Sequence, residues 1–203
     1  MSEISEAIEK AKEGGLIEGG EGFNKKVALI IAILALFLAF AETLGKSAQT
    51  EATTKNIEVS DLWNFFQAKD IRRTTLNVAV DQTNLLAAGL TDPAAKEAVN
   101  KQIESWHKTA ERYESDPQAG NGRKQLEEKA RDAEHERDLS LAKYHHYELS
   151  SGAFQVGIVL ASAAVITGAL ALAWLGGALG ILGLALTALG LFAPHAVHLI
   201  AVL

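Results

Sequence analysis

The sequence predicts an all-α membrane protein with three transmembrane helices and an extramembrane helical stalk. Residues 149–203 of the 203-residue chain contain no Asp, Glu, Lys or Arg. Because a membrane-spanning helix needs about 20 apolar residues, this run can hold two spans as a C-terminal hairpin. A second apolar run, residues 27–41, supplies an N-terminal span. The charged segment between them predicts a three-helix antiparallel stalk that is continuous with spans one and two.

Charge and cysteine content narrow the functional classes. The formal net charge is -6, and phosphate binding requires clustered Lys and Arg, so no nucleic-acid partner is expected. The absence of Cys removes disulfides, thiolate metal ligands and thiol nucleophiles. The sequence also lacks a phosphate-binding loop and a local Ser-His-Asp arrangement. We therefore predict that the protein is not an enzyme and has no catalytic residue and no cofactor.

The N-terminal part of the chain divides into a tail and a first span. Residues 1–22 are acidic and Gly-rich, which favours a flexible tail. The transmembrane helix is predicted at residues 23–45, as a retained anchor and not a cleaved signal peptide. One face of this helix carries small residues at helical spacing, namely Ala28, Ala32, Ala35 and Ala39. Because small residues let helices approach closely in lipid, this face is predicted to pack against other helices.

Glu42 directly follows the apolar run at residues 27–41, and it continues the same small-residue face. A charge at membrane depth is costly and faces a cavity, so Glu42 is a candidate pore or ion site. The alternative places Glu42 at the lipid headgroup level, paired with Lys46 four residues further on. The sequence favours this pair.

The stalk is predicted over residues 46–150. Its three helices are expected at residues 46–88, 93–113 and 123–150. Gly89 ends the first helix, and Asp92 with Pro93 starts the second. Apolar residues at heptad spacing in the second helix predict coiled-coil packing; they are Val99, Ile103, Trp106, Ala110 and Tyr113. The aromatic residues expected to pack within the stalk are Trp63, Phe65, Phe66 and Trp106.

The C-terminal hairpin, residues 151–203, is predicted to contain spans at residues 152–174 and 178–199. The turn is placed at Gly176 and Gly177, because the preceding Trp marks a membrane interface and paired Gly residues favour a turn. Small residues again recur at helical spacing: Gly157, Ala161, Ala164, Gly168, Ala171, Gly176, Gly180, Gly183 and Gly190. These stripes predict close packing, within a bundle or between subunits.

Histidines are the remaining candidates for chemistry. His195 and His198 lie three residues apart near the C-terminus, and His145 lies three residues before Glu148. Each spacing places two ligands on one helix face, but no further ligands follow at a recognisable spacing. The sequence therefore favours the absence of a metal site.

Four stretches of the chain carry a family resemblance. They are the opening of span one at residues 23–28, the tripeptide at residues 50–52, the aromatic stretch at residues 62–72, and the charged helix that enters the terminal hairpin. Together they resemble the bacterial membrane proteins grouped as domain of unknown function 4337. The resemblance covers about residues 23–192, and the aromatic stretch is its most specific part. It implies a bacterial inner-membrane location and no established activity.

Basic residues give a direction across the membrane. Lys25 and Lys26 precede the apolar run at residues 27–41 and Glu42 follows it, which favours a cytoplasmic N-terminus and a periplasmic stalk. We expect a homo-oligomeric scaffold or assembly protein that packs through small-residue faces and stalk seams. Membrane lipid and an unidentified protein are its expected partners. The alternative is an oligomeric ion channel or transporter subunit with Glu42 facing the pore.

Overall fold

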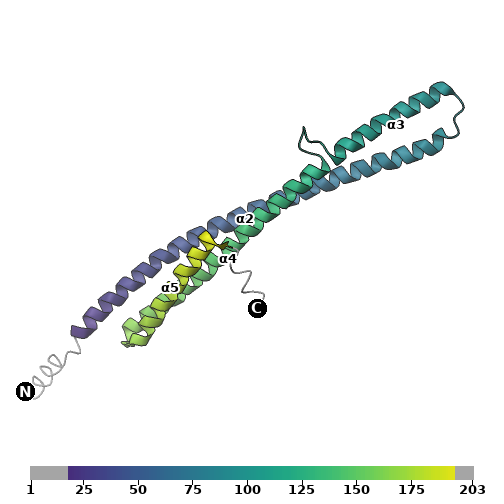
Figure 1. Ribbon diagram of the computed structural model, residues 1–203. Helices are drawn as coiled ribbons and strands as arrows, with labels where there is room; N and C mark the ends of the chain where they lie inside the picture. Colours follow the sequence, from purple (N-terminus) through teal and green to yellow (C-terminus); the bar gives the residue numbers. More distant parts are fainter. Residues whose placement is uncertain (1–17, 195–203) are drawn as a thin grey trace, which may run out of the picture. The chain divides into compact units, whose positions relative to one another are not determined.

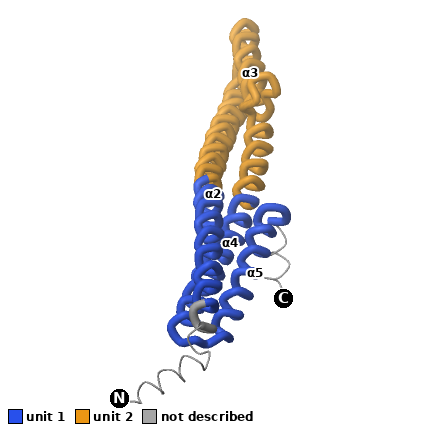
Figure 2. Tube along the Cα trace, turned by 90° about the vertical axis from the view of Figure 1, so that its left-hand side faces the viewer, with its two compact units in different colours: residues 1–50, 139–203 blue, residues 51–138 orange. Residues whose placement is uncertain are grey.

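The computed structural model describes residues 18–194 and contains four helices and no strand over that range (Figure 1). The helices are α2 (Glu18–Ala87), α3 (Pro93–Glu114), α4 (Arg123–Thr167) and α5 (Leu170–Phe192). The chain forms two compact units (Figure 2): unit 1 is residues 1–50 and 139–203, and unit 2 is residues 51–138. Helices α2 and α4 contribute residues to both units. The prediction of an all-helical protein is confirmed.

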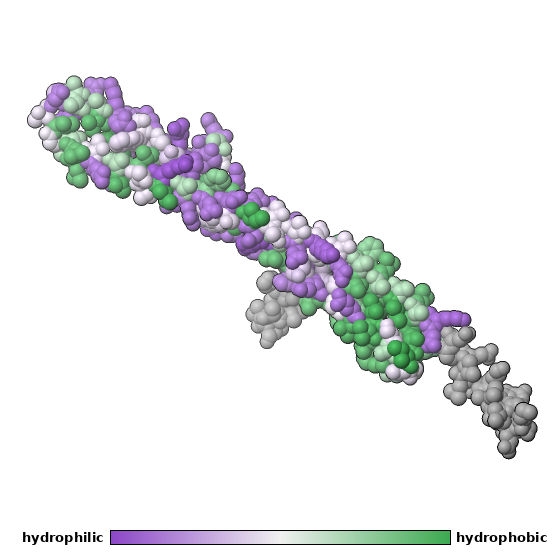
Figure 3. All heavy atoms as spheres, turned by 180° about the vertical axis from the view of Figure 1, so that it is seen from behind, coloured by the Kyte–Doolittle hydropathy of each residue, from purple (hydrophilic) through white to green (hydrophobic). Residues whose placement is uncertain are grey.

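Helices α2, α4 and α5 are long and apolar enough to cross a membrane. Large apolar side chains of unit 1 point outward: Leu36, Phe40 and Ile181 are 56%, 59% and 71% exposed. Figure 3 shows hydrophobic residues gathered over unit 1 and a mixture of hydrophilic and hydrophobic residues over unit 2 on the face drawn. Soluble proteins rarely expose apolar patches above a few hundred Å². The surface of unit 1 is therefore of the kind that lipid or another protein covers.

Unit 1 is a bundle of three helices, in which α4 runs antiparallel to α2 and α5 antiparallel to α4 (Figure 2). One buried cluster joins all three helices: Val27 of α2 packs with Ala161 and Ala164 of α4 and with Ala173 of α5. A second cluster is built on Phe154, whose side chain is fully buried. Both clusters lie within the segments predicted to span the membrane.

The reversal between α4 and α5 lies at Gly168 and not at the predicted Gly176 and Gly177. Gly168 adopts φ +69°, a left-handed conformation that only Gly adopts readily, and its N–H donates to the Ala164 carbonyl at 2.9 Å. Gly176 and Gly177 lie inside α5. The predicted turn is therefore wrong, because apolar helices that pack closely tolerate Gly within their length.

The outer boundaries of the membrane segments also differ from the prediction. Helix α2 covers Glu18–Ala87 and therefore includes Gly19, Gly20 and Gly22 of the tail predicted for residues 1–22. Helix α5 ends at Phe192, short of the predicted end near residue 199. Residues 195–203 and 1–17 lie outside the described residues.

In unit 2, the part of α2 nearer its N-terminus packs against α4, and the part nearer its C-terminus packs against α3. Trp63 Nε1 of α2 donates a hydrogen bond to Glu134 of α4 at 2.9 Å, whereas Arg73 Nε lies 3.3 Å from Glu114 at the end of α3. Helices α3 and α4 thus follow one another along α2, both antiparallel to it (Figures 1 and 2).

The predicted three-helix antiparallel stalk is therefore corrected to a two-helix layer, in which each level of α2 has one partner. The reason is the short loop at residues 115–122, which spans at most ~28 Å when extended. This length is less than the ~33 Å of the 22-residue helix α3. The chain cannot return along α3 before α4 starts, so α4 begins where α3 ends.

A compact group of side chains, which we call the Arg123 cluster, holds the α3–α4 junction against α2. It consists of Phe66, Asp70, Arg73, Glu114 and Arg123. Arg123 Nε and Nη2 donate to the two Glu114 oxygens at 2.9 and 3.2 Å. Arg123 Nη1 lies 3.5 Å from Asp70, and its guanidinium lies 5.2 Å from the Phe66 ring centroid. The hydrogen bonds from Arg123 hold the pKa of Glu114 below its ordinary value.

Candidate functional site

A polar cleft of about 500 Å³ lies between α2 and α4 in unit 1. Its polar lining comes from both helices: Glu42, Lys46, Gln49, Tyr144, Glu148 and Gln155. The two helices approach closely beside it, because a Cβ on Gly45 would lie only 3.5 Å from Tyr147 Cβ. This cleft contains Glu42, the candidate ion site predicted from the sequence, and is therefore a candidate functional site.

Glu42 faces outward on α2 and is tied to α4. Its carboxylate accepts a hydrogen bond from Gln155 Nε2 at 3.4 Å, which is near the upper limit for such a bond. Among the described residues Glu42 makes no ion pair with Lys46, so the favoured prediction of that pair is wrong. A partner 113 positions away in the sequence replaces the local one.

The second acidic residue of the cleft, Glu148, makes polar contacts with two residues of its own helix. Tyr144 Oη donates to Glu148 at 3.3 Å, and His145 Nδ1 lies 3.7 Å from the same carboxylate. Within residues 18–194 no group of three or more His, Asp or Glu side chains could hold a metal ion. His195 and His198 lie outside the described residues.

The small residues of the hairpin meet one another where α4 and α5 pack. A Cβ on Gly176 would lie 2.7 Å from the Gly157 carbonyl oxygen and 3.3 Å from Ala161 N. The structure buries seven of the predicted packing residues in unit 1: Gly157, Ala161, Ala164, Gly176, Gly180, Gly183 and Gly190. Gly168 lies in the turn and Ala171 is exposed, so these two do not take part.

The small stripe of span one is not used inside unit 1. Ala28, Ala32, Ala35 and Ala39 are all exposed. Helix α2 instead presents Leu34, whose methyl groups fill the spaces left by Gly157 and Gly180. A large side chain that fills the space beside a Gly can pack as closely as two facing rows of small residues. The spacing of small residues alone does not reveal this kind of contact.

Ser150 and His146 are two of the buried polar side chains of α4. Ser150 Oγ donates to the Gly183 carbonyl at 2.7 Å and lies 2.6 Å from Thr187 Oγ1. His146 is 1% exposed, and its Nε2 lies 3.1 Å from the Pro194 carbonyl oxygen. Hydrogen bonds offset part of the cost of burying these polar groups, although among the described residues His146 Nδ1 is buried without a hydrogen-bond partner.

Comparison with known proteins shows that the chain is similar to a protein family. The sequence model described as domain of unknown function (DUF4337) matches residues 23–193. The chain belongs to this family. The match confirms the resemblance drawn from the sequence over residues 23–192. No curated protein and no solved structure matches the chain.

The aromatic stretch that carried the DUF4337 resemblance is only partly packed. Trp63 is half-buried, and its ring meets Phe66 edge to face at 5.2 Å between centroids. Trp106 is also half-buried. Phe65, however, is 62% exposed, so the structure does not include it in the packing predicted for the stalk.

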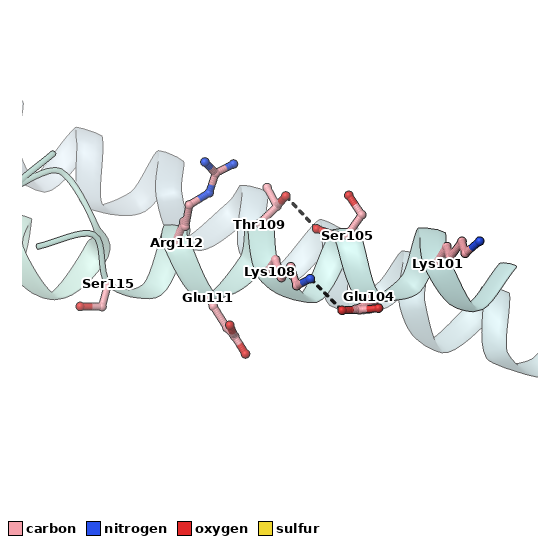
Figure 4. Close-up of a pocket in the computed structure, with 8 residues that line it drawn as sticks. All are labelled: Lys101, Glu104, Ser105, Lys108, Thr109, Glu111, Arg112 and Ser115. Carbon is pink, nitrogen blue, oxygen red and sulfur yellow. Dashed lines mark hydrogen bonds and ion pairs between the residues drawn. The ribbon is translucent and has the colours of Figure 1, made fainter. Parts of the chain in front are cut away.

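A hollow of about 750 Å³ on α3 does not form a comparable site. Its lining residues all belong to α3 or to the residue that follows it, and they point outward from one helix (Figure 4). Lys108 pairs with Glu104 at 2.7 Å, one turn away on the same helix. This arrangement is typical of the solvated face of a helix.

Proposed function

We propose that this DUF4337 protein is a non-enzymatic integral membrane protein that acts as a homo-oligomeric scaffold. One observation carries the proposal, an exposed apolar seam on the part of α2 that belongs to unit 2. The α2 seam consists of Ile57, Phe65, Ile71, Val78 and Leu85, whose exposed fractions range from 49% to 78%. Four of these positions are separated by multiples of seven residues, which places them along one side of the helix.

The α2 seam needs a partner from outside the protomer. Val59 and Val80 of the same helix are buried, so the partner helices within unit 2 already occupy another face of α2. The five seam side chains offer on the order of 500 Å² of surface, a large part of the ~800 Å² that each partner buries in a stable interface. A second copy of the chain supplies the same seam with the same spacing, which favours self-association.

The membrane part of the proposal is supported by composition and by surface. Helices α2, α4 and α5 would insert as three spans in a bacterial inner membrane, with the N-terminus cytoplasmic and unit 2 periplasmic, as the basic residues favour. The exposed Ala28, Ala32, Ala35 and Ala39 stripe would then form a second contact between copies within the bilayer. A scaffold of this kind would hold a client protein at the membrane.

Replacing Ile71 with Glu should weaken association through the α2 seam and shift the oligomer towards smaller species. Because Ile71 is 66% exposed, the variant should keep its helical circular dichroism. Burying a carboxylate in the seam should weaken association at least about a hundredfold. Native mass in detergent measures the outcome, and Asn77→Glu adds the same charge at an exposed position outside the seam. An unaltered chain that is monomeric would contradict the scaffold, and an Ile71→Glu chain that associates as tightly as the unaltered chain would exclude the seam.

A second function, an oligomeric ion channel or transporter subunit, is favoured by the position of Glu42. Glu42 is exposed and continues the exposed Ala stripe of α2, so a ring of copies could bring these carboxylates together around a pore. The oligomer should then conduct in a planar bilayer, and Glu42→Gln should reduce its selectivity for cations. Glu51→Gln removes the same charge at an exposed position of α2 outside the cleft and serves as the control. An oligomer without conductance would exclude this function and leave the scaffold in place.

A further inference from the structure

An apolar groove of about 390 Å³ runs between the start of α2 and the first half of α5 in unit 1. Its lining carries one charged side chain, that of Lys26, beside Trp174, which is 73% exposed. The remaining lining residues are apolar or Gly. Along α5 the groove extends from Leu170 to Ile181, which is about 16 Å at 1.5 Å per residue.

The two walls of the groove are parallel helices, and this fixes its direction. Val27 of α2 packs with Ala173 of α5, and Leu34 packs where a Cβ on Gly180 would stand. Each step is seven residues on both helices. Lys26 therefore lies at the end of the groove where α5 begins, and the other end leads towards the middle of the apolar bundle.

We propose that this groove binds one phospholipid with an anionic headgroup. The headgroup phosphate binds Lys26 Nζ, and one acyl chain lies along α5 towards Ile181. The proposal rests on the membrane insertion proposed above and adds a specific lipid to it. A basic residue beside a groove between membrane helices is the arrangement that selects anionic lipids.

Three features of the groove fit this occupant. Its volume lies within the range of small-molecule sites. Its floor is open at Gly177, where a Cβ would meet no atom within 4 Å, so a hydrocarbon chain can lie against the backbone. The positive end of α5 also points to the Lys26 end of the groove, and its N-cap residue Ala169 makes no side-chain hydrogen bond. Trp174 then lies near the headgroup level, where Trp is favoured.

Quenching of Trp174 by brominated lipids tests the proposal. The full chain is reconstituted in phosphatidylcholine vesicles that contain either brominated phosphatidylglycerol or brominated phosphatidylcholine at the same mole fraction. The Trp174 signal is the difference from Trp174→Phe, since Trp63 and Trp106 belong to unit 2. We expect about a fivefold preference for the anionic lipid at low salt, which corresponds to one basic residue near the surface, and a smaller preference at high salt.

Two variants, each with a matched control, assign the preference to the groove. Lys26→Gln should remove the preference, whereas Lys46→Gln, an exposed Lys elsewhere on α2, should keep it. Gly177→Leu should fill the groove and reduce quenching by the anionic lipid to the level of bulk lipid. Ala171→Leu adds a large side chain at an exposed position of α5 outside the groove, and should leave the lipid preference unchanged.

The outcomes separate this proposal from the proposed function. Equal quenching by the two lipids, or a preference that survives in Lys26→Gln, would overturn the lipid site and leave the membrane scaffold standing. Quenching by neither lipid would place Trp174 outside the bilayer and would overturn both.

Discussion

Replacing Gly176 with Leu should separate α4 from α5, and Gly176→Ala should already destabilise unit 1 by about 1–3 kcal/mol. A Cβ on Gly176 would lie 2.7 Å from the Gly157 carbonyl oxygen, a backbone atom that cannot rotate away as a side chain can. The thermal midpoint of the detergent-solubilised chain should fall for Gly176→Ala. For Gly176→Leu we expect no monodisperse species in size-exclusion chromatography.

The neighbouring residue provides the control. A Cβ on Gly177 would meet nothing within 4 Å. Gly177→Ala should therefore leave the midpoint unchanged or raise it, because Ala favours a helix by up to about 1 kcal/mol over Gly. If the two Ala variants behaved alike, close contact between α4 and α5 at Gly176 would be refuted.

The same pair of residues shows what the sequence could and could not predict about the hairpin. The helical spacing of small residues identified the faces on which α4 and α5 pack, because close packing requires Gly or Ala at regular intervals along each contact face. The turn was misplaced because Gly serves two different purposes. Gly168 is needed for its positive φ, and Gly176 for its small size, and composition alone does not separate them.

Partners across helices were harder to predict than partners within one helix. Lys46 was the expected partner of Glu42 because it lies one turn away, but Gln155 holds that place from another helix. Leu34 was missed for a related reason, since the space it fills is made by Gly157 and Gly180 on two other segments. The residue spacing within one helix indicates which face of that helix packs against another element. It does not indicate which residues of the other element that face contacts.

In unit 2 the helix boundaries followed from local signals, whereas the topology did not. Helix α3 begins at Pro93 with Asp92 as its N-cap, the residues from which its start was predicted. The end-to-end order of α3 and α4 depends on the length of the loop at residues 115–122. The loop length can be read from the sequence. The heptad spacing in α3, however, fits a side-by-side bundle equally well, so it does not distinguish the two arrangements.

Replacing Arg123 with Ala should destabilise unit 2 by about 2–3 kcal/mol, because it removes two charge-assisted hydrogen bonds to Glu114 and the contact with Asp70. Arg123 is 27% exposed, so solvent screens these interactions only in part. Arg131→Ala is the matched control, since Arg131 is 67% exposed and, within residues 18–194, pairs with Glu127 on its own helix. Its effect should stay below about 0.5 kcal/mol. Hydrogen exchange in peptides from residues 51–138 measures both variants, and equal protection in the two would refute the role of the Arg123 cluster.

Acid should remove the same stabilisation. The folded-state pKa of Glu114 is lowered from the ordinary value of 4.5, mainly by its hydrogen bonds from Arg123. A carboxylate with a depressed pKa stabilises the fold above its unfolded pKa, and this contribution is lost as the pH falls through the folded pKa. Protection in unit 2 of the unaltered chain should therefore decrease as the pH is lowered below about 4.5. Arg123→Ala lacks the interaction that lowers the pKa, so the difference between the two chains should narrow in acid. A difference that is constant from neutral pH into this range would mean that Arg123 acts through packing on Phe66 and not through the charge of Glu114.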